Sequence, residues 1–158
     1  MSGAEDWWFE RSWNSFRHGT TAATLEWDTG TADAVLYDTG VPQTVKGFRA
    51  ALPIEMPFVH AAWSGEMVMG TATLDCGALK PENHTRLVRP GDLTWDPKFG
   101  ELCVTYGDAE CRLPSGPNTV VVFGQVTRNL EGLAEFCRAR RFMGAGLLRL
   151  ANREGQPR

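Results

Sequence analysis

The feature that most limits how this chain can fold is a succession of short, strand-like segments separated by turns. The clearest is TVVVFGQV at residues 119–126, a continuous β-branched run typical of a strand buried on both faces. Residues 20–37 predict a hairpin, because two alternating segments flank a turn at residues 28–30. Further strands are predicted within residues 58–75, behind Pro90 and Gly91, in GELCVTYGD and in GLLRLA. About eight short strands at regular turn spacing favour a closed barrel or a sandwich.

Two segments of the domain have helical periodicity. In the first, Pro42 suits an initial turn and Pro53 ends the helix. Its expected buried face carries Val45, Phe48, Ala51 and Leu52. The second is NLEGLAEFCRARRF, whose expected buried face carries Leu130, Leu133, Ala134 and Cys137. Cations in its last turns complement the helix dipole, and these are Arg138, Arg140 and Arg141.

We divide the chain into an aromatic N-terminal extension at residues 1–19, a barrel domain at residues 20–151 and a flexible tail at residues 152–158. Within the extension, Phe9, Trp13 and Phe16 recur with helical spacing. Two interpretations of the extension stay open. It is a helix packed on its own domain, or it is a dimer contact or a lid over a pocket.

The charge balance limits the classes of partner. The chain has 16 basic and 19 acidic residues and a net charge of −3, whereas nucleic-acid binding leaves a basic surplus. No apolar run approaches the roughly 20 residues of a membrane helix, and the start of the sequence lacks the pattern of a signal peptide. We therefore expect a cytoplasmic protein without nucleic-acid or membrane partners. Its four scattered cysteines are then reduced, with a zinc site or a redox pair as the alternative.

Two longer segments resemble cyclophilins. AVLYDTGVPQTVKGFRAALP is similar to their opening strand and first helix, and VVVFGQVTRNLEGLAEF is similar to their late strand and the helix behind it. The segments between them resemble a bacterial family of uncharacterised proteins with a cyclophilin-like fold, and these are HAAWSGEM, ENHT, RPGDLTWDP and GELCVTYGD. The resemblance covers roughly residues 20–151. It implies an all-β fold, a closed eight-stranded barrel with two helices.

The resemblance does not extend to prolyl isomerase activity. In cyclophilins that activity depends on an arginine after the histidine of a Phe-His-Arg strand, and here Ala61 follows His60. A Gln-Phe-Phe segment is missing from the sequence, and Val120 stands where cyclophilins have a histidine. Without an arginine donor to polarise the prolyl amide, we do not expect this chemistry.

The stretch FVHAAWSGEMVMG at residues 58–70 holds the main candidate site. If its strand alternation holds, His60, Ser64 and Glu66 point to one face and Trp63 to the other, unless Gly65 breaks the pattern. Small ligands often bind at a barrel mouth. Histidine has the right basicity for proton transfer, and burial would raise the pKa of Glu66. We therefore predict His60 and Glu66 as catalytic acid/base residues, with Trp63 and Ser64 binding the substrate.

Each of these residues also has an ordinary structural interpretation. His60 can donate to a core carbonyl, and Glu66 can sit on a solvated turn. Four further substrate-binding candidates are Asn83, His84, Tyr106 and Phe123. Asn83 and His84 lie in the segment ENHT, which is a loop reaching the mouth or else a surface turn. Tyr106 and Phe123 are either pocket wall or core.

A metal centre is a weaker hypothesis for the same residues. His60, Glu66 and His84 form a legitimate ligand set, but their spacing specifies nothing. RPGDLTWDP is superficially similar to a cupin strand, yet the sequence has no His-x-His pair. We therefore predict no metal and no cofactor.

The function predicted from the sequence is that of a small-molecule-binding barrel. We expect a cofactor-free enzyme that uses acid/base chemistry, as an isomerase, cyclase, lyase or hydrolase, on a small polar metabolite. The alternative is a non-catalytic binding or assembly module that uses the aromatic arm. In either case we expect a homo-oligomer.

Overall fold

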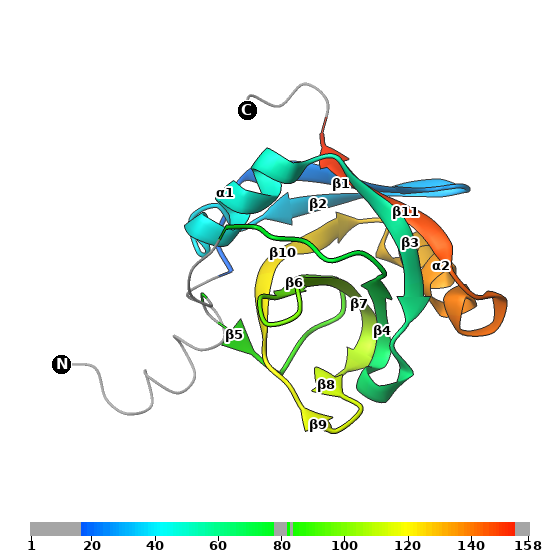
Figure 1. Cartoon of the computed structure of the whole chain (residues 1–158). Helices are drawn as coiled ribbons and strands as arrows, with labels where there is room; N and C mark the ends of the chain where they lie inside the picture. The colour runs from blue at the N-terminus through cyan, green and yellow to red at the C-terminus, as the bar shows by residue number, and fades with distance from the viewer. Residues whose placement is uncertain (1–16, 78–81, 83, 154–158) are drawn as a thin grey trace.

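The computed structural model describes residues 17–77, 82 and 84–153, and within them eight antiparallel strands form a closed barrel (Figure 1). The strands are β1 (Thr21–Trp27), β2 (Gly30–Leu36), β3 (Ile54–His60), β4 (Gly65–Gly70), β6 (Asp92–Asp96), β7 (Glu101–Ala109), β10 (Val120–Arg128) and β11 (Gly146–Asn152). They follow the order β2-β1-β11-β3-β4-β7-β6-β10, and pairing of β10 with β2 closes the circle. The predicted closed eight-stranded barrel is therefore confirmed.

Short elements extend this frame. β5 (His84–Thr85) pairs with the start of β10, and β8 (Arg112–Leu113) forms a small hairpin with β9 (Gly116–Pro117). Residues 108–119 thus contain two short strands and the end of β7. A 3₁₀ turn at Ala62–Ser64 separates β3 from β4. This turn interrupts the strand alternation just before Gly65, the residue that the sequence suggests as a possible break.

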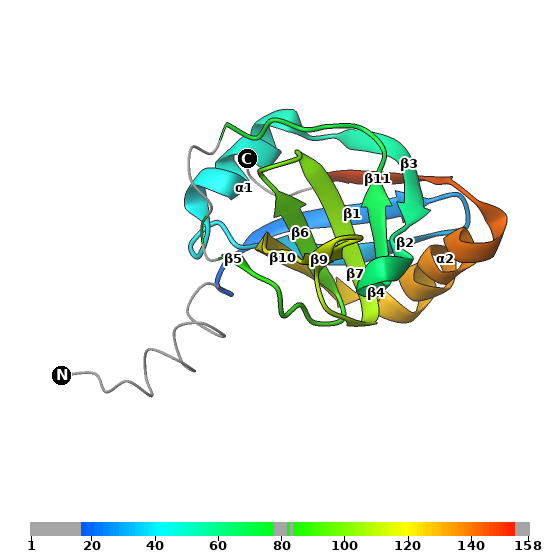
Figure 2. The same cartoon turned by 60° about the horizontal axis from the view of Figure 1, so that its bottom comes forward.

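Both predicted helices are present. α1 (Pro42–Ala51) has proline in its first turn, and α2 (Leu130–Met143) begins at Asn129, whose side chain accepts a hydrogen bond from the Gly132 amide. α2 packs against β2, β3, β4 and β7. Figures 1 and 2 place α1 and β5 on the left of the barrel and α2 on the right. The two helices therefore cover different parts of one core.

The barrel interior is filled by alternate residues of the strands. Phe58 on β3, Val68 on β4 and Val104 on β7 all belong to this core, and Phe123 on β10 stacks on Phe48 of α1 with ring centroids 4.0 Å apart. Burying rings and branched side chains in this way is the main favourable contribution to folding. Because side chains alternate along a strand, the residue two positions beyond the last core residue of each strand also points inward.

Several sequence-based expectations need correction at single residues. Ala51, the last residue of α1, is exposed. On α2, Phe136 joins Leu133, Ala134 and Cys137 in the buried face, whereas Leu130 in the first turn is only partly buried. The extension at 1–19 and the tail at 152–158 fall largely outside the described residues, so those boundaries stay predictions.

Two further findings bear on the classes of protein considered. Neither helix of the described ranges has the length and apolar character that crossing a bilayer demands. All four cysteines are free and buried. Burial raises the pKa of Cys76 and Cys137 to about 12 and that of Cys111 to about 11. These thiols are protonated at neutral pH, which makes them poor nucleophiles.

Candidate functional site

Three of the predicted site residues converge at the part of the barrel that α2 covers. His60 lies two residues beyond the inward Phe58, Glu66 two residues before the inward Val68, and Tyr106 two residues after Val104. Because strand side chains alternate, all three continue the inward rows at the same end of their strands. His60, Glu66 and Tyr106, together with Arg138 of α2, are called the His60 cluster below.

The central contact of the His60 cluster joins an imidazole to a phenol. His60 Nε2 lies 2.6 Å from the Tyr106 hydroxyl, and the two rings meet edge to face with centroids 5.7 Å apart. The other ring nitrogen, Nδ1, is buried and has no hydrogen-bond partner among the described residues. Buried polar atoms are usually paired, so an unpaired histidine nitrogen beside a short hydrogen bond marks a candidate reactive group.

Glu66 reaches this pair because the strand opposite it is irregular. The pairing of β4 with β7 shifts register between Gly65 and Met67, and a side chain at Gly107 would collide with the Glu66 carboxylate. Glu66 Oε1 accepts a hydrogen bond of 3.1 Å from the Asp108 amide. The bulge and the glycine together therefore hold a carboxylate at the rim of the cluster.

α2 supplies the positive charge of the site. Arg138 Nη2 lies 3.8 Å from Glu66 Oε2, and its guanidinium lies 5.6 Å from the centre of the Tyr106 ring. Both Arg138 and Glu66 remain about half exposed, so this ion pair stays accessible to a ligand. A guanidinium with spare donors is a natural partner for a carboxylate or another planar anion.

Electrostatic effects keep the hydrogen-bonded dyad of His60 and Tyr106 uncharged at neutral pH. Burial, with the positive charge of Arg141, holds the pKa of His60 below its ordinary value, and Glu66 opposes this shift. Burial and the charge of Glu66 raise the pKa of Tyr106, while Arg138 opposes that shift. An imidazole that accepts and a phenol that donates therefore form the resting state, or the reverse with the other tautomer.

Trp63 and Ser64 do not join the His60 cluster, because the 3₁₀ turn ends the strand alternation after Ala61. The Ser64 hydroxyl donates to the Arg112 carbonyl and accepts from the Arg112 amide, both at 3.1 Å. It thereby fastens the β8–β9 hairpin to the barrel. Trp63 is 44% exposed and lines, with Met67 and Cys103, a small cleft of about 90 Å³ on the outer surface.

The remaining predicted residues lie elsewhere. Phe123 is fully buried in the core, stacked on Phe48, so it cannot touch a ligand at the mouth. His84 is exposed on β5, opposite Val121 of β10. Asn83 falls outside the described residues. Since His84 is on the side away from α2, the ligand set of His60, Glu66 and His84 is not assembled, and no cluster of potential metal ligands occurs in the described ranges.

Sequence reasoning missed the contribution of α2. Arg138 and Arg141 were assigned only to the helix dipole, yet both act on the dyad. Their spacing of three residues places them on neighbouring positions of one helix face, which was the available signal. The barrel topology decides which strand ends this helix face contacts. The spacing of the two arginines could not reveal it.

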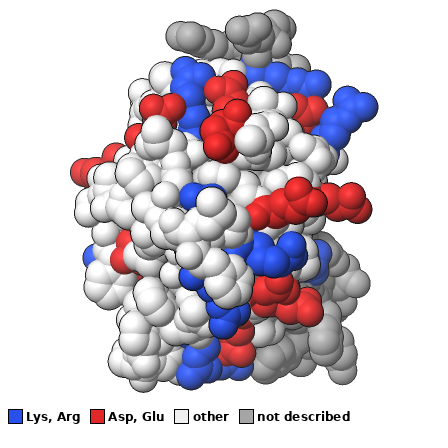
Figure 3. Space-filling view, turned by 90° about the vertical axis from the view of Figure 1, so that its right-hand side faces the viewer, with Lys and Arg blue, Asp and Glu red and all other residues white. Residues whose placement is uncertain are grey.

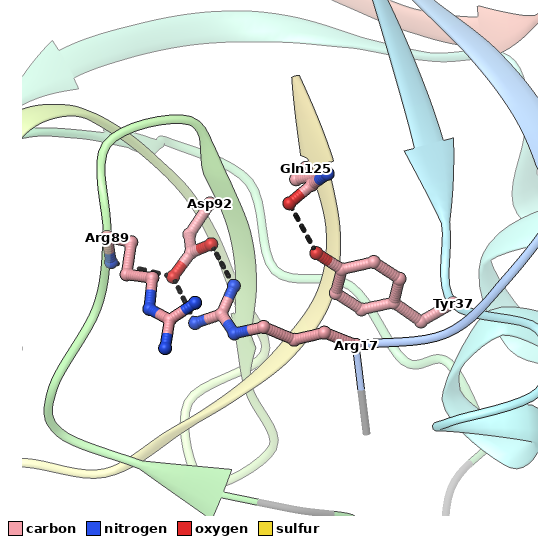
Figure 4. Close-up of polar contacts among 5 residues, drawn as sticks. All are labelled: Arg17, Tyr37, Arg89, Asp92 and Gln125. Atoms are coloured by element: carbon pink, nitrogen blue, oxygen red, sulfur yellow. Dashed lines mark hydrogen bonds and ion pairs between the residues drawn. The ribbon is translucent and has the colours of Figure 1, made fainter. Parts of the chain in front are cut away.

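A second polar cluster surrounds Asp92 of β6 (Figure 4). Asp92, whose side chain is 1% exposed, accepts two hydrogen bonds from the Arg17 guanidinium at 2.6 and 3.0 Å. Its Oδ2 also accepts a bond of 2.7 Å from the Arg89 amide. Nearby, the Tyr37 hydroxyl donates to Gln125 Oε1 at 2.9 Å. These five residues are called the Asp92 cluster, and both oxygens of its carboxylate are fully used.

Comparison with known proteins places the chain by sequence and by fold. The profile of one family, described as "Protein of unknown function (DUF3830)", matches residues 23–152. No curated protein matches the chain.

Solved structures match the barrel at low sequence identity. The hypothetical protein AF2241 from Archaeoglobus fulgidus is 15% identical with a TM-score of 0.58, over 87% of this chain and 98% of its own. A cyclophilin-type peptidyl-prolyl cis-trans isomerase from Cryptosporidium parvum is 12% identical with a TM-score of 0.55, over 86% and 99%. McbB, solved in complex with tryptophan, is 18% identical with a TM-score of 0.65, over 86% of this chain but 46% of McbB. These likenesses show the fold.

Proposed function

The chain belongs to the DUF3830 family, whose function is unknown, and from its own geometry we propose that the His60 cluster binds a small carboxylate-bearing metabolite and moves a proton on it. The observation that carries this proposal is the 2.6 Å contact between His60 Nε2 and the Tyr106 hydroxyl, next to an unpaired Nδ1. Most buried polar side-chain atoms in proteins are paired, so the open Nδ1 favours a functional role for the dyad.

The arrangement supports a proton relay. When the Tyr106 oxygen takes a proton from the ligand, the phenolic proton passes to His60 Nε2 along the existing hydrogen bond. The imidazolium that forms is stabilised by the nearby Glu66 carboxylate, whose charge favours the protonated ring. Return of the proton through Tyr106 to another atom of the ligand restores the enzyme. Isomerisation, elimination and cyclisation all fit this balance.

The ligand class follows from the charges around the dyad. Arg138 is exposed and bound to Glu66 only through a long contact of 3.8 Å. An exposed guanidinium beside a neutral dyad favours a ligand with a carboxylate. McbB, which shares the fold, was solved with tryptophan, itself a small carboxylate-bearing metabolite. A cytoplasmic location, which such a substrate would suit, stays a prediction.

Prolyl isomerisation is a poorer candidate for this site. Ala61, which follows His60, is buried in a small apolar cluster with Met67 and Cys103 and offers no donor to a prolyl amide. We therefore assign no such activity to the chain.

The proposal can be tested without knowing the product. Small carboxylates are screened for a rise in melting temperature, because a ligand that binds the native state stabilises it by mass action. Each binder is then incubated with the protein in D₂O, and exchange of ligand C–H for C–D is followed by NMR. We expect a binder whose exchange falls by about 100-fold or more in Tyr106→Phe and His60→Gln.

Glu135→Gln is the matched control, because Glu135 is an exposed carboxylate on α2 outside the His60 cluster. It should leave both binding and exchange unchanged. Absence of any carboxylate binder, or exchange that Tyr106→Phe leaves intact, would overturn the proposal.

A further inference from the structure

The turn between α2 and β11 carries a cluster of exposed apolar side chains. Phe142 is 81% exposed and Met143 76% at the end of the helix, and Leu147 is 56% exposed at the start of β11. Figure 3 looks at this side of the molecule and shows a projecting uncharged area with charged groups around it. Single exposed apolar residues are ordinary, but three on one turn form a patch of the kind found at interaction sites. Phe142, Met143 and Leu147 are called the apolar tip below.

A groove of about 580 Å³ adjoins the apolar tip. Its aromatic wall consists of Trp27 at the end of β1 and Phe136 of α2, whose ring centroids are 6.0 Å apart. Leu147 lines the groove and also belongs to the tip. The molecule therefore presents a projecting apolar group and an aromatic hollow side by side.

The charges at the two places are complementary. Asp28 and Glu55 line the groove, and neither has an ion pair among the described residues. Arg141 precedes Phe142 at the tip, is exposed, and also has no ion pair in the described ranges. The third acidic residue of the groove, Glu26, is already paired with Arg149 at 3.0 Å. The two basic residues of the groove are also held within it, since Arg149 makes that pair and Arg140 lies over the Phe136 ring at 4.5 Å. Three acidic residues and two arginines leave the groove with a net charge of −1, opposite in sign to Arg141.

We propose that a second copy of this chain docks here, with the apolar tip of each protomer in the groove of the other. Because tip and groove adjoin on one face, a two-fold axis between them engages both pairs at once and closes the assembly at a dimer. Phe142 and Met143 then pack on the aromatic wall of the second copy, and Arg141 meets its acidic residues.

The described chain begins on the other side of the barrel, so a segment joined to it there would have to cross the barrel surface to reach the groove. Its first residue is Arg17, which Asp92 holds on the side of the barrel away from α2 (Figures 1 and 2). A second copy needs no such connection, and it supplies a tip and a groove of matching chemistry.

Sedimentation velocity of the full chain from about 1 to 100 μM tests this inference, and we expect a monomer–dimer equilibrium. The double variant Phe142→Ser, Met143→Ser should raise the dimer dissociation constant by about 30-fold or more, as loss of an apolar hot spot does. Phe99→Ser is the matched control, because Phe99 is a 47% exposed aromatic on the turn between β6 and β7. It should leave the equilibrium unchanged.

Charge reversal identifies the partner surface. Arg141→Glu and Glu55→Arg should each weaken the dimer, and the two together should restore it, because the swapped charges meet again across the two-fold axis. A wild-type chain that stays monomeric at 100 μM would overturn the inference. So would a dimer that survives the Phe142, Met143 variant but dissociates when residues 1–16 are deleted, because the arm would then be its organiser.

Discussion

The Asp92 cluster and the His60 cluster are both partly buried polar groups on the same barrel, but they differ in how completely the central side chain, Asp92 or His60, is paired. Asp92 accepts three hydrogen bonds, two of them from one guanidinium, and its carboxylate is 1% exposed. His60 makes one short bond and leaves Nδ1 without a partner, and the ion pair at its rim is stretched to 3.8 Å. The first arrangement contributes to stability, whereas the second leaves a hydrogen-bonding atom, His60 Nδ1, available.

The difference shows how a buried polar cluster can be assigned a role. A buried carboxylate whose two oxygens both accept hydrogen bonds holds its neighbours in place but has no oxygen left with which to engage a ligand. An incompletely bonded pair lowers stability, and proteins retain such pairs mainly where chemistry needs them. Bonding completeness therefore separates the two clusters more clearly than burial or residue type does.

The largest effect on stability is expected when Asp92 is removed. Asp92→Ala leaves the Arg17 guanidinium, 9% exposed, without its carboxylate, and should lower the free energy of unfolding by about 3–5 kcal/mol. Urea unfolding measures the loss. Asp33→Ala is the control, since its 3.5 Å pair with Arg153 is more exposed and should cost less than about 1 kcal/mol. Equal losses in the two variants would show that the Asp92 cluster is not the structural one.

Removing both members of the His60–Tyr106 dyad should change the free energy of unfolding far less than removing Asp92. The double variant His60→Leu, Tyr106→Phe replaces both partners with apolar groups, so its free energy of unfolding should lie within about 1 kcal/mol of the wild type. Tyr106→Phe alone should cost more, about 1–3 kcal/mol, because it leaves His60 Nε2 without its partner. The comparison is made by urea unfolding. If the double variant loses about as much as Asp92→Ala, the His60 cluster is structural and the proposed function loses its basis.

The sequence predicted the frame of this molecule better than its site. Period-two alternation and the β-branched run at residues 119–126 specify strands, and Pro42 and Pro53 bound α1, so local chemistry was sufficient for the elements. The resemblance to cyclophilins then supplied the closure of the barrel. Ser64 and Trp63 were misplaced because the 3₁₀ turn begins at Ala62, three residues before the possible break at Gly65.

The two clusters themselves required tertiary structure. Arg17 and Asp92 are 75 residues apart, and nothing in either local sequence indicates the other. His60 and Tyr106 are 46 residues apart and meet only because β3, β4 and β7 are neighbours in the barrel. Side chains whose partners come from distant strands can be proposed from residue type, but their pairing depends on register.

Acidification should have a smaller effect on the free energy of unfolding, through the protonation of His60. Burial and Arg141 hold the pKa of His60 below 6.5 in the folded chain, so between that lowered pKa and 6.5 the unfolded state binds more protons. The free energy of unfolding should therefore fall as the pH drops through this window, and stay constant on either side as far as His60 is concerned. Urea unfolding of wild type and His60→Gln between about pH 5 and pH 7.5 measures the contribution. A wild-type minus variant difference that does not change with pH would show that His60 binds protons equally in both states.

The smallest effect on stability is expected at the rim of the His60 cluster, where function and stability separate most clearly. Arg138→Gln breaks a 3.8 Å ion pair between half-exposed groups and should change the free energy of unfolding by less than about 0.5 kcal/mol. Arg86→Gln is a close control, because Arg86 pairs with Glu110 at the same 3.8 Å distance and nearly the same exposure. Only Arg138→Gln should weaken carboxylate binding, measured by the ligand-induced rise in melting temperature. If the two variants bind a carboxylate equally well, Arg138 is an ordinary surface charge and the ligand class must be assigned to other groups.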